Sequence, residues 1–147
     1  MADLGKQIRM WANKQKLNVD KTIRATALDM SSQVVMKTPV KDGFARGSWQ
    51  PTIVSPSRKG AGRADKTGAA TIALISKAVV RAPGNVFYLV SNLSYIVPLE
   101  YGTYGRGPYA TEKTNRTGFS IQAPGGMVRL TVHRFKRALK KALKNVT

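Results

Sequence analysis

Few residues in this chain are of the types that perform chemistry in enzymes. The 147-residue sequence has no cysteine and a single histidine, His133, and its seven acidic residues are scattered singly. Without cysteine there is no thiol nucleophile, no disulfide framework and no cysteine-based zinc site. No HExxH or EF-hand spacing occurs, and no carboxylates are paired for acid–base chemistry. We interpret His133 as an ordinary histidine at the surface or at the boundary of the core. The sequence therefore predicts no enzyme, no cofactor and no metal site.

One segment comes close to a phosphate-binding loop. Residues 60–67 (GAGRADKT) approach the pattern G-x-x-x-x-G-K-[ST]. Asp65 stands at the second glycine position, where its carboxylate would repel phosphate and its Cβ would hinder the cradle of backbone amides. Residues 102–107 (GTYGRG) likewise lack the order G-x-G-x-x-G. We therefore expect both segments to be loops and not nucleotide sites.

The balance of charge is the strongest compositional signal. Lys and Arg number 25 against 7 Asp and Glu, which gives a formal net charge of +18. This charge favours an anionic partner, either nucleic acid or an acidic protein surface. Hydrophobic residues make up 42% of the chain, enough to build a core, and the length suits one domain over residues 1–147. With no apolar run of about 20 residues and no signal-like start, we expect a soluble protein without a membrane partner.

Apolar periodicity predicts a helical N-terminus over residues 1–37. Leu4, Ile8 and Trp11 repeat at intervals of four and three residues, and the rhythm continues as far as residue 34. Asn18 is a suitable cap for a second helix, so one long helix and two shorter helices are both open. The pair Thr38-Pro39 ends the pattern, because the residue before a proline is disfavoured in a helix. The single apolar face indicates that this helix lies on something.

Shorter elements follow. Residues 44–55 favour a strand with Pro51 at an edge or bulge, and residues 86–90 favour a short, largely buried strand. Residues 69–80 fit either a helix or a strand, and we prefer the helix. Two flexible loops are expected, at 56–68 and at 103–123. A loop as long as the second is usually functional in a small domain.

The last predicted element, over residues 124–145, is a helix with one apolar and one basic face. No acidic residue follows Glu112, and the basic residues exceed what complementing the helix dipole requires. Those of the terminal part are our candidate contacts for DNA or for an acidic partner: Arg134, Arg137, Lys140, Lys141 and Lys144.

Four motifs occur in a fixed order along the chain: residues 38–49 (TPVKDGFARGSW), 88–95 (YLVSNLSY), 99–102 (LEYG) and 120–129 (SIQAPGGMVR). In this order the set resembles the tailed-phage neck and tail-completion (head–tail joining) proteins, similar to the lambda minor tail protein Z type. The resemblance spans roughly residues 38–135.

The resemblance implies an α+β fold, with a long N-terminal helix and a C-terminal helix packed on a small, mostly antiparallel sheet, and with long extended loops. It implies a structural virion protein that forms a ring, commonly a hexamer, at the head–tail junction. That ring would join tail to head, leave a DNA channel and have no enzymatic activity. Its expected neighbours are other neck, connector or tail-tube proteins and DNA that passes without sequence-specific contacts. Assembly would take place in the host cytoplasm. The alternative is a basic nucleic-acid-binding module without enzymatic activity.

The candidate contact residues follow from the motifs and the two loops. Trp49 is a large apolar anchor, either in the core or at an interface. The loops would be arms that reach neighbouring subunits or the adjoining ring. Their candidate contact residues are Arg58, Lys59, Arg63, Tyr104, Arg106 and Tyr109. Glu100 is the one acid in an apolar stretch, so we hypothesise that it pairs with Arg129, with a solvated Glu100 as the alternative.

Overall fold

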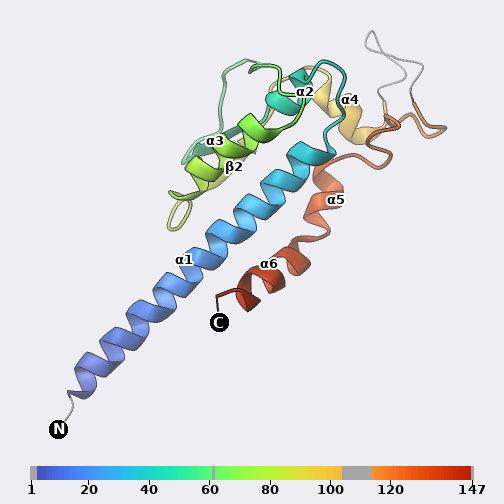
Figure 1. The fold of residues 1–147 in the computed structure, drawn as a ribbon. Helices are drawn as coiled ribbons and strands as arrows, with labels where there is room; N and C mark the ends of the chain where they lie inside the picture. Colours follow the sequence, from blue (N-terminus) through green and yellow to red (C-terminus); the bar gives the residue numbers. More distant parts are fainter. Residues whose placement is uncertain (1–2, 61, 104–113, 147) are drawn as a thin grey trace.

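The computed structural model describes residues 3–60, 62–103 and 114–146. Its elements follow one another as α1 (Leu4–Lys37), α2 (Phe44–Gly47), β1 (Gln50–Ile53), α3 (Ala69–Val79), β2 (Phe87–Val90), α4 (Ile96–Tyr101), α5 (Val128–Val132) and α6 (Phe135–Lys144). Figure 1 shows α1 as a long rod, with the short elements gathered around its C-terminal end. The predicted α+β class, with a small antiparallel sheet, is confirmed.

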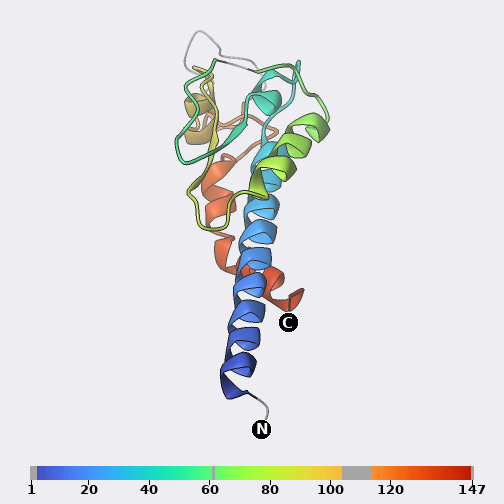
Figure 2. The same cartoon turned by 90° about the vertical axis from the view of Figure 1, so that its left-hand side faces the viewer.

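The helix α1 is one continuous helix, so the second cap considered at Asn18 is not used. The Asp3 carboxylate caps its start by accepting a hydrogen bond from the Gly5 amide at 3.1 Å. Its C-terminal half is covered by α3 on one side and by α5 and α6 on another. Its N-terminal end projects beyond the other elements in both views (Figures 1 and 2). The expectation that the whole apolar face lies on something is therefore met only over part of its length.

The strand predicted over residues 44–55 is wrong in its first part. Gly43, with φ of 88°, starts the one-turn helix α2, and the strand β1 begins only at Gln50. Ala45 of α2 and Trp49, which lies just before β1, are both buried. β1 pairs antiparallel with β2, with Pro51 opposite Leu89.

The helix preferred for residues 69–80 is confirmed as α3, which packs on both α1 and β1. Its buried residue Ile75 joins Val35 of α1 and Leu99 of α4 in the core. The predicted strand over residues 86–90 is confirmed as β2, but its four residues are half-buried and not largely buried. The core therefore sits between the end of α1, α3, the sheet and α4.

The C-terminal helix predicted over 124–145 is in fact two helices. α5 ends at Val132, and α6 starts at Phe135 after a turn in which Arg134 has φ of −92° and ψ of 3°. The turn redirects the chain so that Ala138 and Ala142 are buried where α6 packs along α1. Figure 1 shows α5 and α6 running beside α1 with this change of direction.

The described residues of the predicted loop over 56–68 form no helix or strand, and hydrogen bonds tie them to neighbouring elements. The Gln50 side chain donates to the Gly60 carbonyl at 2.8 Å, and the Asn92 side chain donates to the Lys59 carbonyl at 2.6 Å. The Asp65 amide donates to the Gly43 carbonyl at 3.0 Å. These bonds anchor the segment at residues 59, 60 and 65.

Candidate functional site

The C-terminal end of α1 is held by residues of the first motif. Thr38 is buried, and its hydroxyl donates to the Val34 carbonyl at 2.8 Å. The guanidinium of Arg46 donates to the Met36 and Thr38 carbonyls at 3.1 Å each and to the Lys66 carbonyl at 2.8 Å. A cation at the C-terminus of a helix pairs with its unsatisfied carbonyl groups. Arg46 therefore closes α1 and ties it to the segment that precedes α3.

Trp49 is 6% exposed and lies in the core, which decides between the two positions left open by the sequence. Its indole Nε1–H donates to the Thr38 hydroxyl at 2.8 Å. Beside it, the Ser48 hydroxyl contacts the Ser91 hydroxyl at 2.6 Å, which joins the first motif to the second. Gly47 is needed for this packing, because a Cβ there would collide with the Arg63 carbonyl oxygen.

Glu100 is 7% exposed and joins the third motif to the fourth. Its carboxylate accepts hydrogen bonds from the amides of Met127, Val128 and Arg129 at 2.7, 2.8 and 2.8 Å. Arg129 Nε lies 3.2 Å from Glu100 Oε1, so the hypothesised ion pair is formed. Arg129 also donates to the Glu100 carbonyl at 2.6 Å. Gly126 permits this approach, since a Cβ there would press on the Glu100 carbonyl.

The environment of Glu100 also sets its ionisation. Burial alone would raise the pKa of Glu100, but the amides of Arg129, Met127 and Val128, followed by the Arg129 side chain, outweigh burial and hold the pKa below its usual value. The guanidinium of Arg129 lies over the Tyr101 ring at 4.8 Å, so it is fixed by an aromatic face as well as by the carboxylate.

Gln122 joins the first motif to the fourth. Its side-chain amide donates to the Val40 carbonyl at 2.9 Å, and its side-chain oxygen accepts from the Val40 amide at 2.7 Å. Hydrogen bonds thus link the second motif to the first, the first to the fourth and the fourth to the third. We call these linked residues the motif cluster. It consists of Thr38, Val40, Ser48, Trp49, Ser91, Glu100, Gln122 and Arg129.

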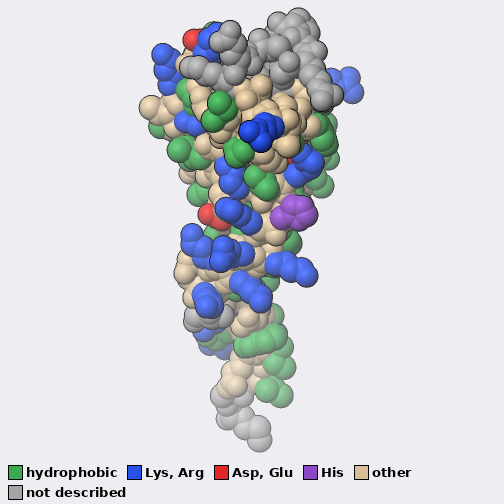
Figure 3. All heavy atoms as spheres, turned by 90° about the vertical axis from the view of Figure 1, so that its right-hand side faces the viewer, with side chains coloured by type: hydrophobic (Ala, Val, Ile, Leu, Met, Phe, Trp, Pro, Cys, Tyr) green, Lys and Arg blue, Asp and Glu red, His purple; other side chains and the backbone are tan. Residues whose placement is uncertain are grey.

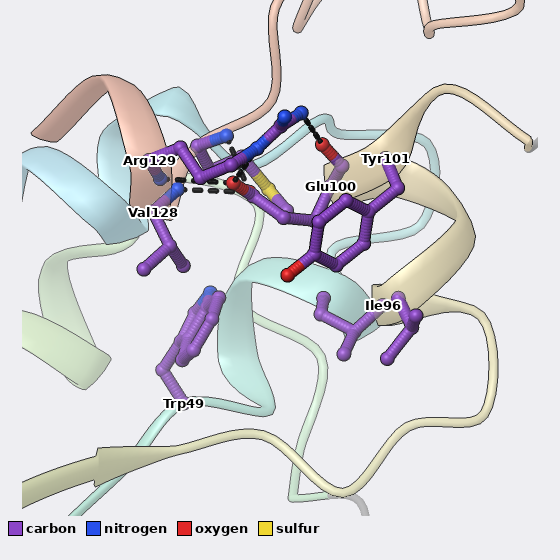
Figure 4. Close-up of a pocket in the computed structure, with 8 residues that line it drawn as sticks. Trp49, Ile96, Glu100, Tyr101, Val128 and Arg129 are labelled. Carbon is purple, nitrogen blue, oxygen red and sulfur yellow. Dashed lines mark hydrogen bonds and ion pairs between the residues drawn. The ribbon is translucent and has the colours of Figure 1, made fainter.

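A pocket of about 210 Å³ opens beside the motif cluster (Figure 4). Trp49 and Ile96 form apolar walls, and Tyr101 lies across from Trp49. Both Glu100 and Arg129 reach the pocket, but each is already engaged with the other. No group of three or more His, Asp or Glu side chains in the described part of the chain is placed to hold a metal ion.

The other candidate residues divide into three groups. Arg58, Lys59 and Arg63 are exposed on the anchored segment between β1 and α3. Tyr104, Arg106 and Tyr109 lie outside the described residues. The basic candidates of the C-terminus are all exposed, and Figure 3 shows Lys and Arg side chains gathered over α5 and α6 beside the exposed His133. These basic candidates are Arg134, Arg137, Lys140, Lys141 and Lys144. Among the described acids, Asp29 approaches this group, with Lys141 Nζ 3.9 Å from its carboxylate.

Sequence reasoning missed the role of Asp65. Its buried carboxylate accepts from the Gly68 amide at 2.8 Å and from both the amide and the hydroxyl of Thr71 at 2.8 Å each. Asp65 is therefore the cap of α3, which explains why an acid stands in the segment that resembles a phosphate loop. An acid shortly before a helical pattern was the available signal. Arg46 and Gln122 were missed too, although both stand inside the quoted motifs.

Comparisons with known proteins found no relative with which this geometry can be compared. No protein-family model, curated protein or solved structure matches the chain. As for the membrane, none of the helices in the described ranges is both long enough and apolar enough to cross a bilayer.

Proposed function

We propose that this chain is a structural protein of a tailed-phage particle that forms a ring at the head–tail junction and leaves a channel for DNA. The observation that carries the proposal is the order of the four motifs together with the hydrogen bonds that link them. Residues 82 positions apart, Val40 and Gln122, are joined by two hydrogen bonds. The residues that resemble the family's motifs also bind one another in the fold. This supports an architecture shared with that family more strongly than isolated sequence matches would.

The surfaces left by this fold are suited to assembly. The segment between β1 and α3 carries the exposed residues Arg58, Lys59 and Arg63, and its backbone is hydrogen-bonded at residues 59 and 60. An exposed basic segment on a rigid support loses little conformational entropy when it binds. In a ring, these side chains would meet acidic residues of a neighbouring subunit or of the adjoining ring.

The test is the mass and shape of the purified chain. Light scattering should give a discrete multiple of the 16.0 kDa chain, with six copies favoured, and electron microscopy should show closed rings. The double variant Arg58→Glu/Lys59→Glu should weaken assembly. The control variant Lys77→Glu/Arg81→Glu makes the same charge change at the exposed end of α3 and should assemble normally. A chain that stays monomeric and is absent from the necks of phage tails would overturn the proposal.

A second candidate function, a DNA-binding module without enzymatic activity, is favoured by the basic group on α5 and α6. Lysines and arginines that neutralise phosphates release counterions, so the logarithm of the affinity should fall with log salt by about 0.9 per phosphate. Lys140→Glu/Lys144→Glu should lower both the affinity for duplex DNA and this slope, whereas Lys77→Glu/Arg81→Glu should change them less. If the chain fails to bind duplex DNA at low salt, this candidate is excluded.

A further inference from the structure

The N-terminal end of α1 carries apolar side chains that no other element of the described chain covers. Every residue from 4 to 14 except Gly5 is exposed. Leu4, Ile8 and Trp11 are 69%, 57% and 65% exposed, and their spacing of four and three residues places them along one line of the helix. We call these three residues the free seam. Because an isolated helical segment of this length is marginal in water without a packed face, the free seam is a surface that needs a cover.

The free seam continues a contact that the fold already makes. Thr22 and Thr26 lie on the same line of α1 and are buried, and Asp29 and Lys37 on that side contact Lys141 of α6 and Thr131 of α5. α6 thus covers this line of α1 and ends at Lys144. A helix placed where α6 stops would cover the free seam in the same way that α6 covers the threonines (Figure 1).

Charge identifies the kind of helix that fits. Lys14 borders the free seam on one side, and it is exposed. The end of α6 adds Lys140 and Lys144, also exposed. We propose that the free seam is the docking site for an acidic amphipathic helix of another protein. The partner's apolar residues would cover the free seam, and its flanking Glu and Asp side chains would pair with these lysines, as flanking charges do in coiled coils.

A second copy of this chain is a poorer occupant than an acidic helix. Two free seams placed together would bring Lys14 of each copy close to Lys14 of the other, and each chain carries a net charge of +18. Like charges brought together across an interface cost several kcal/mol. The proposal goes beyond the proposed ring and holds whether or not the chain forms one.

A lipid surface is also a poorer fit. A helix that lies in a membrane interface gathers its apolar residues on one face and its charges on the other. Here Met10 and Leu17 are exposed on a face away from the free seam, at 64% and 59%. The apolar line of the free seam is therefore narrow, as in helix pairing, and the opposite side is not purely polar.

The test uses the full chain and a synthetic helical peptide of roughly 18 residues, or five turns. The peptide has leucines at alternating four- and three-residue spacing and glutamates on both flanks. A second peptide keeps the leucines and carries lysines on the flanks. Trp11 reports binding, because covering an exposed indole shifts its fluorescence to shorter wavelength, while Trp49 is already buried. We expect the glutamate peptide to bind and shift the emission, and the lysine peptide to bind at least tenfold more weakly.

Two variants test whether the peptide binds at the free seam or at another face of α1. Both introduce one glutamate, at positions of nearly equal exposure. Ile8→Glu, in the free seam, should weaken binding of the glutamate peptide by tenfold or more, whereas Leu17→Glu should change it by less than about twofold. Equal losses in both variants, equal binding of both peptides, or no binding would overturn the proposal. It would also be overturned by a larger shift of Trp11 emission with phosphatidylserine-containing vesicles, or by a dimer in light scattering that only Ile8→Glu disrupts.

Discussion

The two tryptophans of this chain mark two regions with opposite roles. Trp49 belongs to the motif cluster, where it is 6% exposed and its indole N–H is hydrogen-bonded to Thr38. Trp11 belongs to the free seam and is 65% exposed. In the motif cluster, polar groups from distant parts of the sequence satisfy one another and define one geometry. In the free seam, large apolar side chains have no such partners in the described chain. Size and hydrophobicity alone therefore do not tell which residues build the fold and which are presented outward.

The largest effect should come from Glu100→Gln in the motif cluster. The new amide NH₂ would face backbone N–H donors, and Arg129 would lose its ion pair. We expect the free energy of unfolding to fall by about 3 to 5 kcal/mol, because the buried carboxylate loses several charge-assisted hydrogen bonds, each worth about 1.5 to 3 kcal/mol. Urea unfolding followed by circular dichroism measures this loss. In the control, Asp29→Asn removes the ion pair with Lys141, whose side chain is 71% exposed, and should cost at most about 0.5 kcal/mol.

Acid should unfold the chain through two buried carboxylates, Glu100 of the motif cluster and Asp65 at the start of α3. Burial would raise the pKa of Asp65, but hydrogen bonds from the Thr71 amide and hydroxyl, the Gly68 amide and the Thr67 hydroxyl lower it, as the amides do for Glu100. Both groups stay ionised in the folded state at a pH where the unfolded chain takes up protons. Their stabilisation is therefore present above about pH 4 and lost as the pH falls below it.

Thermal melts from neutral pH to about pH 3, at constant moderate ionic strength, test this dependence. Asp65→Asn should lower the melting temperature at neutral pH and flatten its fall in acid. Asp42→Asn, which removes an exposed carboxylate, should do neither. A melting temperature that stays constant down to pH 3 would contradict the assignment.

A smaller loss is expected from Trp49→Phe. Phenylalanine keeps an aromatic ring in the core but removes the N–H bond to Thr38 and leaves a small cavity. We expect the free energy of unfolding to fall by about 1 to 3 kcal/mol. Since Trp11 remains, the loss of buried indole emission in this variant also separates the two tryptophan signals. A loss below 0.5 kcal/mol would mean that the hydrogen bond within the first motif contributes little.

The sequence was sufficient to predict the helices and strands whose own apolar residues follow a clear spacing. α1, α3 and β2 follow from the spacing of their own apolar residues, and Glu100 was paired with Arg129 because a lone acid in an apolar stretch needs a donor. The one-turn helix α2 was missed because contacts distant in sequence decide it, such as Arg46 with the Met36 and Lys66 carbonyls. No local sequence pattern predicts that the Gln122 side chain will form hydrogen bonds with the Val40 backbone.

The same limit applies to the surfaces. The apolar face of α1 was visible in the sequence, but its pattern does not say where α6 will stop covering it. The break between α5 and α6 falls at His133 and Arg134, which include neither proline nor glycine, so propensity gave no signal for it. The free seam therefore became visible only when the elements were placed in space.

Between the two regions, the contact of α1 with α6 offers a change that should stabilise the chain. The Thr26 hydroxyl is buried and has no hydrogen-bond partner among the described residues. Thr26→Val replaces it with a methyl group of similar shape, so the free energy of unfolding should rise by about 1 kcal/mol. Thr22 is the matched control, because its buried hydroxyl donates to the Asn18 carbonyl at 2.8 Å. Thr22→Val should give no gain, and a gain of the same size there would refute the role assigned to the unpaired hydroxyl.

The smallest effect should come from Trp11→Ala in the free seam. In the isolated chain this side chain is exposed, so its removal loses little buried area, and alanine favours the helix by several tenths of a kcal/mol over tryptophan. We expect the free energy of unfolding to change by no more than about 0.5 kcal/mol, measured by urea unfolding at a concentration where light scattering finds a monomer. The corresponding Trp49→Ala should cost about 3 to 5 kcal/mol. A Trp11→Ala loss above about 1 kcal/mol in the monomer would mean that the free seam contributes to the fold, and the contrast between the two regions would fail.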